Sequence, residues 1–147
     1  MVLALVLAAA VCQSGRGPLD GLPGSAREGV GPVEALSPCA VASLPPPVRA
    51  ALAGTLGETD LSMADPGGPW NSTCVPTSPL PRRQLVFAGH SGAAWVVHFW
   101  DGGFVPAYRV AVVRVQADRG RVTWSGSCWS PQGPEAKGDA WLCRPVP

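Results

Sequence analysis

The sequence predicts an α+β domain in which one N-terminal helix packs on an antiparallel meander of about four strands, held by two disulfides. Three observations support this fold class. One stretch repeats apolar residues every fourth position, and a series of β-branched and aromatic stretches joined by short turns fills the second half. The third observation is an even set of four cysteines, residues 39 to 143, in a chain that starts like an exported protein. A length of 147 residues corresponds to one domain.

The N-terminus has the pattern of an export signal. Residues 2–11 are uniformly apolar, too short to span a bilayer but typical of a signal-peptide core. We therefore expect residues 1–12 to be a signal peptide and the protein to be periplasmic or extracellular. Cys12 directly follows the run, and "LAAAVC" is similar to a lipobox, which would anchor the protein to the outer membrane. The alternative is that Cys12 leaves with the signal peptide.

Four further cysteines, Cys39, Cys74, Cys128 and Cys143, predict two disulfides in an exported chain. The sequence has no Cys-x-x-Cys pair, so we expect no metal site. Four cysteines allow three connectivities. We favour Cys39–Cys74 and Cys128–Cys143, because each pair closes a segment with its own proline-rich loop.

Residues 13–38 contain glycine, proline, serine and isolated charges without periodicity, which indicates a flexible tether. The folded domain is then expected over residues 39–147. Its first element is a helix between Ser43, a suitable N-cap, and Gly57, a suitable C-terminal stop. The apolar stripe of this helix consists of Leu44, Val48, Leu52 and Leu56.

Four strands are predicted after the helix. The turn-rich segment 58–81 precedes them, and short connections between them favour a meander. In the last strand Val122, Trp124 and Cys128 are expected to point inward. Residues 129–147 are expected to form a loop tied back by Cys143. The predicted strands are 84–88, 94–100, 108–115 and 121–128.

The string "GHSGA" at residues 89–93 is close to the Gly-x-Ser-x-Gly elbow of serine hydrolases. A β-branched and aromatic stretch follows it, whereas the elbow requires a helix at that point. We therefore interpret this string as a hairpin turn and Ser91 as a turn residue rather than a nucleophile.

The leading functional hypothesis is a non-catalytic envelope module that binds an envelope protein or a cell-wall component. Trp95 and Trp124 are expected in the core, whereas Trp100, Trp129 and Trp141 lie near turns and are candidates for an exposed aromatic patch. A net charge of +1 argues against nucleic-acid binding. We expect no cofactor, and membrane attachment only through a lipid on Cys12.

The alternative hypothesis is a small periplasmic enzyme or enzyme inhibitor that uses His98, Asp101, Tyr108 and Arg109 around the "DGG" turn. His98 also fits a partly buried, hydrogen-bonded histidine. On either hypothesis, alanine at His98 or Asp101 is expected to leave the fold intact. The candidate binding residues are His98, Trp100, Asp101, Tyr108, Arg109 and Trp129.

The central third of the chain resembles a type of small exported bacterial protein of unknown function. The resemblance is carried by the ordered segments "RRQLVFAGHSG", "WVVHFWDGG", "YRVAVVRV" and "VTWSGSC". These correspond to an arginine-rich strand, a W-x-x-H-aromatic strand ending in glycines, and a Y-x-V strand. The resemblance implies an exported α+β domain and no particular activity.

Overall fold

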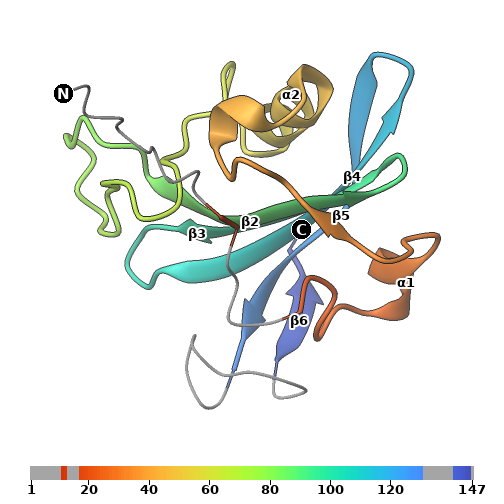
Figure 1. The fold of residues 1–147 in the computed structure, drawn as a ribbon. Helices are drawn as coiled ribbons and strands as arrows, with labels where there is room; N and C mark the ends of the chain where they lie inside the picture. The colour runs from red at the N-terminus through yellow and green to blue at the C-terminus, as the bar shows by residue number, and fades with distance from the viewer. Residues whose placement is uncertain (1–10, 13–16, 131–140, 147) are drawn as a thin grey trace, which may run out of the picture.

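The fold is a six-stranded antiparallel meander with a helix on one face, as the computed structural model shows for residues 11–12, 17–130 and 141–146 (Figure 1). The strands follow one another in sheet order from β1 to β6. Within the described ranges, no helix is long and apolar enough to cross a lipid bilayer. The elements are α1 (Gly24–Arg27), β1 (Glu34–Ala35), a 3-10 turn η1 (Val41–Ser43), α2 (Pro46–Thr55), β2 (Arg83–Ser91), β3 (Ala94–Asp101), β4 (Ala107–Gln116), β5 (Arg119–Trp129) and β6 (Leu142–Pro145).

The predicted meander of central strands is confirmed, but the sheet is larger than four strands. The two additional strands are the edge strands β1 and β6, of two and four residues. Both are too short to show an alternating pattern, and β6 lies in the segment expected to be a loop. They become strands only because β2 and β5 offer them unpaired backbone groups.

The hairpin turns explain the glycine-rich string and one unusual alanine. Ser91 pairs with Ala94 as the last residue of β2, so the β2–β3 turn consists of Gly92 and Ala93, with Gly92 at φ +57°. Ser91 is thus a hairpin residue, as expected. The β4–β5 turn begins at Ala117, which has φ +56°, a left-handed conformation that costs a residue with a Cβ.

Helix α2 covers one face of the sheet. Val48 and Leu52 of the predicted stripe lie on the helix and Leu44 lies just before it, and all three are fully buried. Gly57 follows the helix at φ +73°, as predicted for its end. Ser43 is not the N-cap, because the helix starts at Pro46 and Ser43 belongs to η1. Prolines at the first two helical positions have no N–H group for a serine hydroxyl to bind.

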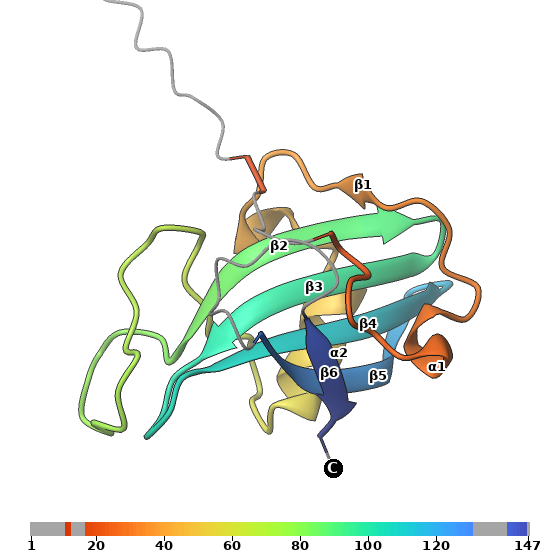
Figure 2. The same ribbon diagram turned by 90° about the horizontal axis from the view of Figure 1, so that it is seen from below.

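The prediction of a flexible tether over residues 13–38 is wrong for the described residues 17–38. This segment forms α1 and β1 and covers the sheet face opposite α2 (Figures 1 and 2). Leu22 is 3% exposed and Ala26 is 2% exposed, and both pack with Val96 and Val112. A few small apolar residues are enough to bind the segment because the sheet face is itself apolar, a feature that local composition does not reveal.

A β-bulge changes the predicted facing of β5. Val112 pairs with Trp124 and Val113 pairs with Val122, which leaves Thr123 unpaired in the ladder. Val122 therefore packs into the core under α2, whereas Trp124 packs into the core on the opposite face. Val122 and Trp124 do not share a face, as the simple alternation predicted.

The structure confirms two disulfides and corrects one pairing. Cys128 is bonded to Cys143 as expected, but Cys39 is bonded to Cys12. Cys74 is an exposed free thiol. Cys12 lies against β2, where the Ala88 N–H donates to its Sγ at 3.2 Å. Cys39 comes four residues after β1, which pairs with the same strand, and is therefore carried to Cys12 rather than to Cys74.

This pairing also corrects the role of Cys12. Its sulfur is bonded to Cys39 and is not available for a lipid thioether, and the residue belongs to the folded domain rather than to a discarded leader. The remainder of the expected signal peptide, residues 1–10, lies outside the described residues.

We predict that Cys12→Ser lowers the free energy of unfolding by about 3 kcal/mol, because the bridge spans 27 residues of sequence and restricts the unfolded chain. Cys74→Ser is the matched control and should change stability by less than about 0.5 kcal/mol, because this thiol is free and exposed. Urea unfolding monitored by tryptophan fluorescence measures both. Equal losses in the two variants would contradict the assigned pairing.

We also predict that Ala117→Gly stabilises the protein by about 0.5–1 kcal/mol, because glycine adopts the positive φ of this turn without steric cost. Asp118→Gly in the same turn should not stabilise, because Ala117 is the only non-glycine residue with a positive φ in the described part of the chain. Thermal unfolding compares the two variants. A gain for Asp118→Gly alone would refute the explanation.

Candidate functional site

The sheet separates the four residues that the enzyme hypothesis placed together. Trp100 pairs with Tyr108, and alternation puts His98 on the same face as this pair, away from α2. Asp101 and Arg109 point to the α2 face, because each directly follows a residue, Trp100 or Tyr108, whose side chain points to the other face. The "DGG" turn thus carries two different clusters on opposite sides of the sheet, and no single substrate contacts all four side chains.

His98 is a structural histidine on the face away from α2. It is completely buried, with Nδ1 3.0 Å from the Tyr108 hydroxyl and Nε2 2.9 Å from the Pro18 carbonyl oxygen. A carbonyl oxygen only accepts, so Nε2–H donates to Pro18, and Nδ1 shares the second hydrogen bond with the Tyr108 hydroxyl. The expected hydrogen-bonded histidine is confirmed, and it fastens the N-terminal segment to β3.

Asp101 is the centre of an ionic cluster on the α2 face. Its side chain is 10% exposed, with Oδ2 3.1 Å from Arg109 Nε and Oδ1 3.3 Å from Arg83 Nε. Arg82 Nε lies 3.7 Å from Oδ1, and Arg83 also forms an ion pair with Glu58. Three guanidiniums therefore surround two carboxylates. The cluster ties the ends of β2, β3 and β4 to the loop after α2.

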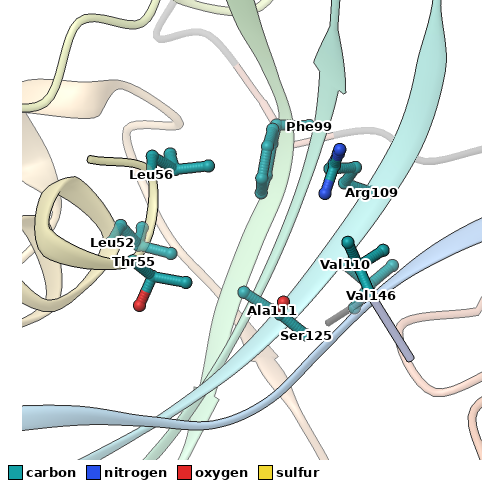
Figure 3. Close-up of a pocket in the computed structure, with 9 residues that line it drawn as sticks. All are labelled: Leu52, Thr55, Leu56, Phe99, Arg109, Val110, Ala111, Ser125 and Val146. Atoms are coloured by element: carbon teal, nitrogen blue, oxygen red, sulfur yellow. The ribbon is translucent and has the colours of Figure 1, made fainter. Parts of the chain in front are cut away.

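A cleft of about 60 Å³ lies beside this cluster, between α2 and the sheet (Figure 3). Its volume matches roughly two water molecules at ~30 Å³ each. Among the described residues that line it, Arg109 alone is charged, and it is paired with Asp101. The cleft is lined by Leu52, Thr55, Leu56, Phe99, Arg109, Val110, Ala111, Ser125 and Val146. A cleft of this size and lining fits ordered water rather than a substrate.

We predict that Asp101→Ala lowers the free energy of unfolding by about 3 kcal/mol, because it leaves the buried guanidinium of Arg83 and the partly buried guanidinium of Arg109 without their shared carboxylate. This replaces the sequence-based expectation of an unaffected fold. Arg82→Ala is the control: its side chain is 60% exposed, so we expect a loss of at most about 1 kcal/mol. Chemical denaturation tests both, and an unaffected Asp101→Ala protein would show that the cluster is dispensable.

An aromatic hollow of about 300 Å³ opens on the other face. The register aligns Trp100, Tyr108, Cys128 and Cys143 in one row across β3 to β6. Trp100 meets Tyr108 edge to face with ring centroids 5.0 Å apart, and Trp141 lies 5.0 Å from the same tyrosine ring. The hollow is lined by Trp100, Val105, Pro106, Ala107, Tyr108, Ser127, Cys128, Trp129, Ser130 and Trp141.

Trp141 is buried, contrary to its expected place on an exposed patch. It is 2% exposed, and a Cβ at Gly21 would lie 2.4 Å from its carbonyl oxygen. The Cys143 N–H donates to the Gly21 carbonyl at 3.2 Å. The disulfide and this hydrogen bond fold the C-terminal strand under the N-terminal segment, so Trp141 forms a wall of the hollow rather than surface.

The rim of the hollow is unusually apolar and exposed. Val105, which lines it, is 82% exposed, and the adjacent Phe104 is 95% exposed. Trp129 is 40% exposed, with the Arg144 guanidinium carbon 5.3 Å from its ring centroid. Sequence reasoning found Trp100, Tyr108 and Trp129 but missed Phe104 and Val105. An apolar pair between "DGG" and a proline, in a predicted turn, was the available signal.

In comparisons with known proteins, no family model, no curated protein and no solved structure matches this chain.

Proposed function

We propose that this protein is an exported, non-catalytic binding module that holds an apolar group of an envelope protein in its aromatic hollow. The single observation behind this proposal is the hollow itself, in which tryptophan and tyrosine rings surround an open space beside an exposed apolar rim. Concave apolar surfaces with a few polar groups are the usual form of binding sites.

The chemistry of the lining favours an aliphatic or aromatic side chain as the bound group. Its walls are rings, Val105, Pro106 and the Cys128 disulfide, so transfer of an apolar group from water is the main driving force. A sugar ring is a weaker candidate, because Arg144 occupies one face of the most exposed tryptophan, Trp129. These features favour the envelope protein over the cell-wall component among the expected partners.

Export is supported by the two disulfides, which persist in oxidising compartments. If a leader is removed, the cleavage must fall before Cys12, because the mature domain needs this residue to pair with Cys39. We propose a periplasmic or extracellular location on this basis.

The test is an NMR titration with N-acetylphenylalanine amide as the probe and N-acetylglucosamine as the comparison. We expect saturable shifts at the hollow with the first compound only. Trp129→Ala should weaken binding about tenfold, since it removes apolar contact worth ~1.4 kcal/mol. Leu142→Ala is the matched control, because Leu142 is the exposed cross-strand neighbour of Trp129 and does not line the hollow.

Unchanged affinity in Trp129→Ala, or saturable shifts that cluster away from the hollow, would refute the proposal. A preference for N-acetylglucosamine would reassign the module to a cell-wall ligand.

A further inference from the structure

We propose that one end of the molecule inserts into the surface of an anionic lipid membrane. This end, called the tip below, consists of the loop 69–81 and the β3–β4 loop 102–106. The inference goes beyond the proposed function, because the partner is a bilayer and the contacts lie on loops at the end of the sheet, of which Val105 and Pro106 also line the hollow.

The two loops of the tip form one structural unit. The Gly103 N–H donates to the Ser72 carbonyl at 3.3 Å, and the Asn71 N–H donates to the Pro81 carbonyl at 2.8 Å. A Cβ at Gly102 would lie only 2.3 Å from the Asn71 carbonyl oxygen, so the loops touch through their backbones. Both loops extend beyond the same end of the sheet in the two views (Figures 1 and 2).

The tip exposes apolar side chains from both loops. The exposed fractions are 95% for Phe104, 82% for Val105, 51% for Val75 and 41% for Leu80. Isolated exposed apolar residues are common, but four at one end of a small domain require an explanation. Phe104 and Val75 do not line the hollow, and highly exposed apolar side chains on loops suit a fluid interface better than a preformed pocket of a protein partner.

The charge distribution fits an anionic bilayer. Neither loop contains Asp, Glu, Lys or Arg, so insertion buries no charge. At the base of the tip, the 60%-exposed Arg82 donates from Nε to the Gly102 carbonyl at 2.5 Å. Arg82 belongs to the cluster of three guanidiniums and two carboxylates, which therefore has a net positive charge. A cationic base below an apolar tip meets lipid phosphates at the depth where the apolar residues enter the interface.

The experiment is co-sedimentation of the full chain with two kinds of vesicles. One kind is pure phosphatidylcholine and the other contains equal parts of phosphatidylcholine and phosphatidylglycerol. We expect clear binding to the anionic vesicles and weaker binding to the neutral ones. The double variant Phe104→Ser and Val75→Ser should bind anionic vesicles about tenfold more weakly, because both exposed apolar contacts are lost.

Further variants distinguish insertion of the tip from non-specific adsorption to vesicles and from binding at the hollow. Leu142→Ser changes an exposed apolar residue outside the tip and should bind vesicles like the wild type. Arg82→Gln should reduce binding to anionic vesicles and leave binding to neutral ones unchanged. The double variant should still bind N-acetylphenylalanine amide, because neither Phe104 nor Val75 lines the hollow.

Three results would overturn the proposal. The first is a wild-type protein that stays in the supernatant with both vesicle types. The second is a double variant that sediments as well as the wild type while its melting temperature is unchanged. The third is a wild-type dimer in sedimentation equilibrium that the double variant converts to monomer without vesicle binding, which would assign the tip to self-association. Each result leaves the titration of the hollow to be judged on its own.

Discussion

The alternation of side chains across β3 and β4 decides what this molecule can do. Asp101 and Arg109 are directed to the α2 face, where the carboxylate joins an ionic network. Trp100 and Tyr108, one residue earlier in each strand, are directed to the opposite face, where they form an aromatic hollow. The sheet between them is a single layer. It separates a polar face, where the charged side chains form ion pairs, from an apolar face with an open hollow. The binding hypothesis depends on this division, because none of the described residues that line the hollow carries a charge.

The second face of the sheet depends on a segment distant in sequence. His98 is completely buried, and its two ring nitrogens are hydrogen-bonded to the Pro18 carbonyl and the Tyr108 hydroxyl. The same segment brings Gly21 against Trp141 and closes one wall of the hollow. The hydrogen bonds of His98 therefore contribute to the shape of the hollow, through Tyr108 and through the segment that contains Pro18. This arrangement explains why residues 17–30 belong to the domain although their composition is that of a linker.

The sequence was a good guide wherever a local pattern repeats several times. The α2 stripe and the four long strands each repeat a facing rule over many residues, so periodicity revealed them. Prediction from sequence failed where one long-range contact outweighs local composition. Examples are the contact of Cys12 with Ala88, the packing of Leu22 on the sheet and the pairing of the short strand β6.

Of the candidate site, the rings of Trp100, Tyr108 and Trp129 were predictable as aromatic residues near turns. It was not predictable that these rings surround one hollow, because their arrangement depends on the strand register and on the disulfide of Cys143. The bulge in β5 opposite Val112 and Val113 could not be predicted from the sequence. The extra residue, Thr123, reverses the face to which the preceding residues of β5 point.

The Cys12–Cys39 bond constrains the order in which the chain matures. Cys12 contacts Ala88, so the surface that receives it is synthesised 76 residues later than the cysteine itself. A polypeptide that emerges from its N-terminus therefore exposes this thiol, together with that of Cys39, well before β2 exists to position them. The contact that positions Cys12 can form only after β2 has been made, and until then both thiols can react with each other, with Cys74 or with an oxidoreductase that meets the emerging chain.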